Sequence, residues 1–128
     1  MAIMVKILLL ILLVATITLV EAADPPAKWR AALKALDVMD VKMRQAVDAV
    51  VAAAPPAKQS EVQEAAMAER LDVSLALARV EETGNEKKVE SMAASYEKAA
   101  DLVVAAPPAD KLKVMKEAFR AVTKAAAL

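Results

Sequence analysis

A short proline-containing segment occurs twice in this chain and limits the folds open to it. Residues 50–58 read VVAAAPPAK, and residues 103–111 read VVAAPPADK. A shorter copy, DPPAK, occupies residues 24–28. Proline lacks a backbone N–H and clashes with the preceding helical turn, so each Pro-Pro pair should end one helix before the next begins. The repeat therefore predicts helices joined by similar corners.

The amino-acid composition favours one small α-helical domain. The chain has 128 residues with one glycine, no cysteine and no histidine, and 59% of its residues are hydrophobic. Alanine, leucine, methionine, lysine and glutamate are good helix formers, whereas glycine is a poor one. Because no disulfide can form without cysteine, helix packing alone must hold the fold.

Residues 1–22 differ from the rest of the chain and are predicted to be a cleaved secretory signal peptide. Lys6 supplies a positive charge, residues 7–20 are apolar apart from two threonines, and small residues follow at Ala22 and Ala23. The apolar run is shorter than the roughly 20 residues that a bilayer span needs, so we expect no stable membrane span after cleavage. The mature protein would be a secreted, extracellular domain of residues 23–128.

The proline corners and Gly84 divide the mature chain into four predicted helices. We expect them at about residues 26–53, 56–82, 86–105 and from 108 into the C-terminal tail. Gly84 suits a left-handed position after a helix, and Asn85 suits an N-cap. Short corners require successive helices to run antiparallel, so the predicted fold is all-α: an antiparallel up-down-up-down four-helix bundle.

Three of the predicted helices carry one apolar stripe with spacings of three and four residues, which is typical of a single buried face. The stripes are Trp29, Leu33, Leu36, Met39, Met43, Val47 and Val50 in the first helix, Val89, Met92, Tyr96, Ala99 and Val103 in the third, and Leu112, Met115, Phe119 and Val122 in the fourth. We expect Trp29 and Tyr96 to lie in the core or at its edge with their polar tips at the surface.

The predicted helix at residues 56–82 is apolar on two opposite sides. One stripe contains Val62, Ala65, Ala66, Val73, Ala76, Leu77 and Val80, and the second contains Met67, Leu71, Leu75 and Ala78. Either this helix has neighbours on both sides, or the second stripe is a face for a partner or apolar ligand, including weak self-association. Glu69 lies within the first stripe, so we expect it to reach solvent at an edge or to pair with a basic residue of another helix.

Most residue types used in catalysis are missing or lack a suitable arrangement. Without histidine or cysteine, the commonest general base and the usual transition-metal ligands are absent. Asp37 with Asp40, and Glu61 with Glu64, have the spacing of an acid–base or cation-binding pair, but solvated surface charge is the commoner role of such residues. We therefore expect no catalytic residue, no cofactor-binding residue, no cofactor and no metal site.

The charge balance argues against a nucleic-acid partner. The chain has 17 basic and 17 acidic residues and no basic block, so it offers little attraction for phosphates. Its single glycine also excludes a glycine-rich phosphate loop. Binding of a lipid or another apolar ligand between the helices is an alternative function. A structural role in association with the cell wall is a further alternative function.

The second corner and its flanking helices resemble the group 5 and group 6 grass-pollen allergens. Residues 105–119, AAPPADKLKVMKEAF, are similar to the alanine-proline corner and following helix of that family, and residues 89–100 resemble the tyrosine-containing helix before it. Residues 55–66 resemble an earlier copy of the corner, and the whole likeness extends over about residues 36–122. It implies a secreted, alanine-rich bundle of plant pollen or floral tissue, with IgE as a partner.

The same resemblance carries two further implications. Group 5 members have been associated with ribonuclease activity, and the family's Ala-Pro corners with proline hydroxylation. Glu61, Glu64, Lys111 and Lys113 are charged residues that follow the corners, but they form no recognisable ribonuclease arrangement. Weak ribonuclease activity is thus an alternative implied by the family alone.

Overall fold

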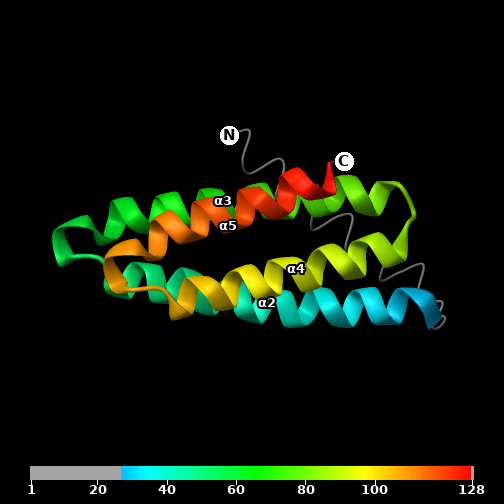
Figure 1. The fold of residues 1–128 in the computed structure, drawn as a ribbon, viewed down its shortest axis with the longest axis horizontal. Helices are drawn as coiled ribbons and strands as arrows, with labels where there is room; N and C mark the ends of the chain where they lie inside the picture. Colours follow the sequence, from blue (N-terminus) through cyan, green and yellow to red (C-terminus); the bar gives the residue numbers. More distant parts are fainter. Residues whose placement is uncertain (1–26, 128) are drawn as a thin grey trace. The chain divides into compact units, whose positions relative to one another are not determined.

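The computed structural model describes residues 27–127, which contain four α-helices and no strand. The α-helices are α2 (Ala27–Ala53), α3 (Gln59–Glu82), α4 (Glu86–Ala105) and α5 (Lys111–Ala126) (Figure 1). The all-α prediction is confirmed. The predicted signal peptide at residues 1–22 lies outside the described residues. Among those that are described, no helix is long and apolar enough to cross a membrane.

Of the described residues, 31–127 lie in one compact unit, and the contacts described below lie within it. Residues 27–30 are the first turn of α2 and belong to the other unit. The predicted helix bounds are close to the observed ones, with one difference. The second and fourth predicted helices each begin with a short 3₁₀-helix, η1 (Pro56–Lys58) and η2 (Pro108–Asp110), before the α-helix starts.

The two proline corners have nearly the same backbone conformation. Pro55 has φ −57° and ψ 145°, and Pro107 has φ −56° and ψ 147°. The N–H of Lys58 donates to the carbonyl of Pro55 at 2.8 Å, and the N–H of Asp110 donates to that of Pro107 at 2.9 Å. The sequence repeat is therefore also a structural repeat, consisting of a helix, a Pro-Pro corner and a second helix.

The first side chain of the following α-helix reaches back across each corner. Gln59 Nε2 donates to the carbonyl of Ala54 at 3.4 Å, and Lys111 Nζ donates to the equivalent carbonyl of Ala106 at 2.8 Å. Lys111 also donates to two carbonyls in the last turn of α4. These bonds bring side-chain donors to carbonyls at the ends of α2 and α4, so they stabilise the helix ends.

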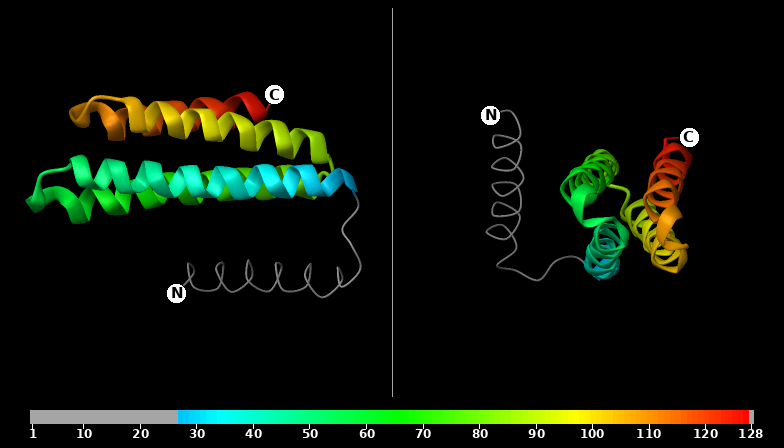
Figure 2. Two further views of the ribbon diagram at one scale, coloured as in Figure 1. Left: turned by 90° about the horizontal axis from the view of Figure 1, so that it is seen from below. Right: turned by 90° about the vertical axis from the view of Figure 1, so that its left-hand side faces the viewer.

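The repeat divides the compact unit into two hairpins. The first hairpin (α2, η1 and α3) and the second hairpin (α4, η2 and α5) form two layers, which Figure 2 shows one above the other. Two ion pairs join the layers: Lys42 of α2 with Asp101 of α4 at 3.0 Å, and Arg120 of α5 with Glu69 of α3 at 2.8 Å. The second hairpin thus lies on the first with α4 near α2 and α5 near α3.

The core between the hairpins consists mainly of small or flexible side chains. Its buried apolar residues in α2 and α3 are Ala32, Met39, Met43, Ala46, Val47, Val50, Ala66, Val73, Leu77 and Val80, and those in α4 and α5 are Val89, Met92, Ala93, Tyr96, Ala99, Ala100, Val103, Met115 and Phe119. The predicted stripe at residues 89–103 is confirmed throughout. Leu33 is exposed, contrary to the prediction, because the face of α2 that enters the core there presents Ala32 instead.

Tyr96 and Phe119 form the aromatic centre of the core. Their ring centroids are 6.2 Å apart and their planes meet at 86°, an edge-to-face contact. The expectation that the tip of Tyr96 reaches the surface is wrong, because the whole Tyr96 side chain is buried and its hydroxyl is hydrogen-bonded to Thr123 of α5. The Thr123 hydroxyl donates to the carbonyl of Phe119 at 3.0 Å, so the Tyr96 hydroxyl donates to Thr123. Burial raises the pKa of Tyr96.

The corner between the hairpins has the predicted chemistry. Gly84 has φ 73°, the left-handed conformation that glycine adopts without a steric cost. The side chain of Asn85 accepts a hydrogen bond from the N–H of Lys88 at 3.1 Å and caps α4. This turn joins α3 directly to α4 and brings the second hairpin back onto the first.

Candidate functional site

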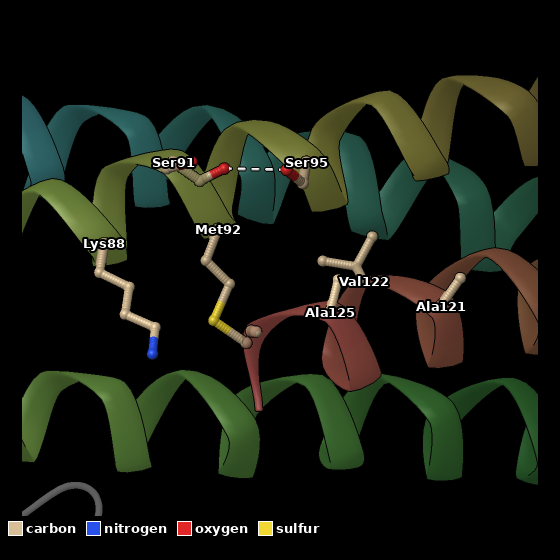
Figure 3. A pocket seen from close by; sticks show the side chains of 8 residues that line it. Lys88, Ser91, Met92, Ser95, Ala121, Val122 and Ala125 are labelled. Carbon is tan, nitrogen blue, oxygen red and sulfur yellow. Dashed lines mark hydrogen bonds between the residues drawn. The ribbon is translucent and has the colours of Figure 1, made fainter. Parts of the chain in front are cut away.

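Two grooves flank α5, which is the shortest α-helix of the described chain and ends in small residues. The α4–α5 groove has a volume of about 450 Å³. It is lined by Lys88, Ser91, Met92, Ser95, Ala121, Val122, Ala125 and Ala126. Figure 3 shows Met92 reaching from α4 towards the end of α5, with Lys88 extended beside it. Small side chains on α5 leave this space open because they cannot fill the distance to α4.

The α3–α5 groove lies on the other side of α5. It consists of two adjoining cavities of about 360 and 220 Å³, which share Ala76, Arg79, Thr123 and Ala127. The remaining lining residues are Glu69, Asp72, Val73, Leu75, Phe119, Arg120 and Lys124 in the larger cavity, and Val80, Thr83, Lys88, Met92 and Ala126 in the smaller one. Its interior is therefore apolar and its polar groups are mainly basic.

One charged side chain of the α3–α5 groove is buried and paired. Glu69 is only 5% exposed, and its Oε1 accepts a hydrogen bond from Arg120 Nη2 at 2.8 Å. Of the two alternatives expected for Glu69, the structure shows the second, a pair with a basic residue of another helix. Since Arg120 is itself mostly exposed, the pair closes the apolar interior on one side and contacts solvent on the other.

Three basic side chains line the α3–α5 groove without an ion-pair partner among residues 27–127. They are Arg79 on α3, Lys88 on α4 and Lys124 on α5. The only acidic lining residue outside the Glu69–Arg120 pair is Asp72. An anionic group at this rim would therefore meet unpaired positive charge. Sequence reasoning missed this cluster because its members come from three helices and share no spacing in the chain.

The structure separates the four residues of the predicted partner or ligand face. Met67 is 46% and Leu71 44% exposed on the outer side of α3. Leu75 and Ala78 are half-buried, and Leu75 lines the α3–α5 groove. The second stripe of this helix is thus divided between an open surface and the edge of a groove.

The acidic pairs considered for chemistry are not brought together in a site. Asp40 forms ion pairs with Arg44 at 2.9 Å and Arg70 at 2.6 Å, whereas Asp37 is exposed. The pair at residues 61 and 64 is also exposed. Within residues 27–127, no group of three or more acidic, histidine or cysteine side chains could hold a metal ion. Lys111 is engaged at the second corner.

Glu81 on α3 is expected to make folding stability depend on pH. Burial raises its pKa above the ordinary value of 4.5. The folded state therefore binds this proton more tightly, so the stability contributed by protonated Glu81 is present below pH 4.5 and is lost as the pH rises through the raised value. We expect Glu81→Gln to remove this loss and raise the free energy of unfolding at pH 7 by about 0.5 kcal/mol, since solvent screening keeps the effect small.

Urea denaturation at pH 4 and pH 7 measures the effect of Glu81→Gln. The matched control is Glu82→Gln, because Glu82 is the exposed neighbour of Glu81 on the same helix. An equal response of the two variants at pH 7 would show that burial of Glu81 carries no cost.

Comparison with known proteins places the chain beside uncharacterised plant sequences. The profile of a family described as "OsI_030282 C-terminal domain" matches residues 34–127. Uncharacterized proteins OsI_031781 and OsI_030282 of Oryza sativa subsp. indica are each 45% identical to this chain over 87 residues. The aligned region covers 68% of this chain and 63% of each rice protein, so the chain spans less than two thirds of these relatives. No solved structure matches it.

Proposed function

Because the chain belongs to the OsI_030282 C-terminal domain family, whose two rice relatives are uncharacterised, we propose a function from its own geometry. The protein is a secreted, non-enzymatic helical bundle that binds a single-chain anionic lipid in the α3–α5 groove. The groove's apolar interior beneath an unpaired basic rim is the observation that carries this proposal.

The lipid class follows from the two kinds of surface in the α3–α5 groove. A hydrocarbon chain would lie against the half-buried side chains of Leu75 and Ala76, where it would displace water from apolar surface. An anionic head group would lie near Arg79 and Lys124, which have no acidic partner in the described chain. The larger cavity, about 360 Å³, falls within the range of about 300–1,000 Å³ typical of small-molecule sites.

Several parts of this proposal come from the sequence. Residues 1–22 act as the signal peptide, and residues 23–128 form the mature domain, an antiparallel up-down-up-down four-helix bundle. The likeness of its corners to those of the group 5 and group 6 grass-pollen allergens supports a role outside the cell and recognition by IgE. Binding of IgE from grass-pollen-allergic donors to the purified protein tests that likeness separately.

Native mass spectrometry with lipid extraction tests lipid binding and secretion together. The mature protein is purified from its own secretion pathway. We expect a chain that begins after Ala22 or Ala23 and carries a retained anionic lipid. A lipid-free chain that also fails to bind added fatty acid would overturn the lipid-carrier function. An uncleaved N-terminus would overturn the signal peptide.

A charge reversal at the rim tests the position of the head group. Arg79→Glu is expected to weaken binding of a dansyl-labelled fatty acid about tenfold, equivalent to about 1.4 kcal/mol, because it replaces an attractive charge by a repulsive one. Lys34→Glu is the matched control, since Lys34 is an exposed cation on α2, away from the groove residues. Equal binding by both variants in fluorescence titration would contradict the proposed site.

A further inference from the structure

The repeated corners define equivalent positions in the two hairpins. Residue 55 corresponds to residue 107, a separation of 52 positions, and the corner bonds of Gln59 and Lys111 keep the same register at the start of α3 and α5. By this register, Met67 on α3 corresponds to Phe119 on α5, and Leu71 corresponds to Thr123. Corresponding residues point in similar directions relative to their own hairpin.

Phe119 and Thr123 lie on the face of α5 through which the second hairpin packs against the first. Phe119 is fully buried, and both residues line the groove against α3. Arg120, between them, forms the ion pair with Glu69 of α3. The corresponding face of α3 carries Met67 and Leu71 but is exposed, because no hairpin precedes it in the described chain.

The receiving surface is repeated as well. On α3, Glu69 and Val73 lie against α5 in the α3–α5 groove. Their equivalents on α5 are Ala121 and Ala125, which line the open α4–α5 groove of about 450 Å³. The first hairpin contacts the second through the face of α3 that carries Glu69 and Val73. The equivalent face of α5 in the second hairpin is therefore left open. Alanine at both positions leaves room for a side chain such as Met67, whose flexible thioether adapts to irregular space.

We propose that the α4–α5 groove binds the outer face of α3 from a second copy of this chain. The association is head to tail and repeats, between molecules, the stacking of the two hairpins within one molecule. Stacked helical repeats associate through their exposed end surfaces when no capping unit covers those ends. A head-to-tail contact of this kind leaves one free groove and one free α3 face at the ends of every assembly, so growth depends on concentration.

Sedimentation velocity of lipid-free mature protein tests this association. We expect the mean sedimentation coefficient to rise over a hundredfold increase in concentration. Met67→Glu and Ala125→Glu should each abolish the rise, because each places a charge in one half of the contact. Val38→Glu is the matched control, because Val38 is exposed on α2 and its counterpart in the second hairpin, Glu90, is exposed as well, so the change should leave the rise unaltered. Circular dichroism confirms that each variant is folded.

Mixing the two defective variants gives the decisive result. Met67→Glu retains an intact α4–α5 groove, and Ala125→Glu retains an intact α3 face. An equimolar mixture is therefore expected to form heterodimers and nothing larger. Absence of any concentration dependence in the unmodified protein, an equal loss with Val38→Glu, or no dimer in the mixture would each overturn the proposal. Neither substituted residue lines the α3–α5 groove, so these outcomes are independent of lipid binding.

Discussion

Phe119→Ala is expected to lower the free energy of unfolding by about 3–5 kcal/mol, the usual cost of removing a buried aromatic ring. Phe119 is fully buried, packs edge-to-face on Tyr96 and forms part of the wall of the α3–α5 groove. Its surroundings are rich in alanine and valine, which are too short to fill the space that the ring leaves. For a small domain with a total stability near 5 kcal/mol, the loss would leave much of the protein unfolded at ambient temperature.

Urea denaturation followed by circular dichroism measures the cost of Phe119→Ala. Phe119→Leu should recover more than half of the lost stability, because it keeps most of the buried volume. Leu102→Ala is the surface control and should change stability by less than about 0.5 kcal/mol, since Leu102 is exposed. A cost for Phe119→Ala as small as that of Leu102→Ala would mean that the core rearranges to fill the cavity.

Arg120→Ala is expected to lower the free energy of unfolding by about 2 kcal/mol. It leaves the buried carboxylate of Glu69 without its only hydrogen-bond donor in the described chain. The cost stays below the 3–5 kcal/mol typical of fully buried pairs because Arg120 is mostly exposed and water can enter in its place. Adding Glu69→Gln to Arg120→Ala should restore at least half of the loss, because a neutral amide tolerates burial better.

Arg44→Ala provides the matched control for Arg120→Ala. Arg44 also pairs with a carboxylate, that of Asp40, but both partners are substantially exposed and lie four residues apart on one helix. Such pairs contribute about 0.3–0.5 kcal/mol. Thermal and urea denaturation should therefore separate the two arginine variants clearly. Equal effects, or no recovery in the double variant, would contradict a structural role for the buried pair.

The fold was largely predictable because the sequence marks its corners and faces strongly. The repeated prolines located the corner within each hairpin, and Gly84 with Asn85 located the turn between α3 and α4. The stripe of α4 was predicted correctly because its members, from Val89 to Val103, recur at regular spacings of three and four residues. The burial of Leu33 was predicted wrongly, because alanine also fills core positions in this chain. Ala32 is fully buried, whereas apolar spacing alone favours its larger neighbour.

The grooves could not be predicted from the sequence because they depend on how helices of different length fit together. Helix propensity and spacing indicate where α5 begins, but not that its alanine-rich end leaves space beside both α3 and α4. The basic rim likewise depends on three helices meeting at one end. Glu69 shows what the sequence does allow: its apolar surroundings predicted a cross-helix partner, while only the structure identifies that partner as Arg120.

The Pro-Pro corners also affect where a digestive protease would cleave the protein. Exposed chain turns are the usual sites of cleavage, and a protease must draw several residues into an extended conformation with free backbone N–H groups. At both Pro-Pro corners two successive residues have no N–H, and the next turn is already held by internal hydrogen bonds. The turn at Gly84 contains no proline, so a first cut is expected there, and it would divide the chain between the two hairpins without breaking either of them.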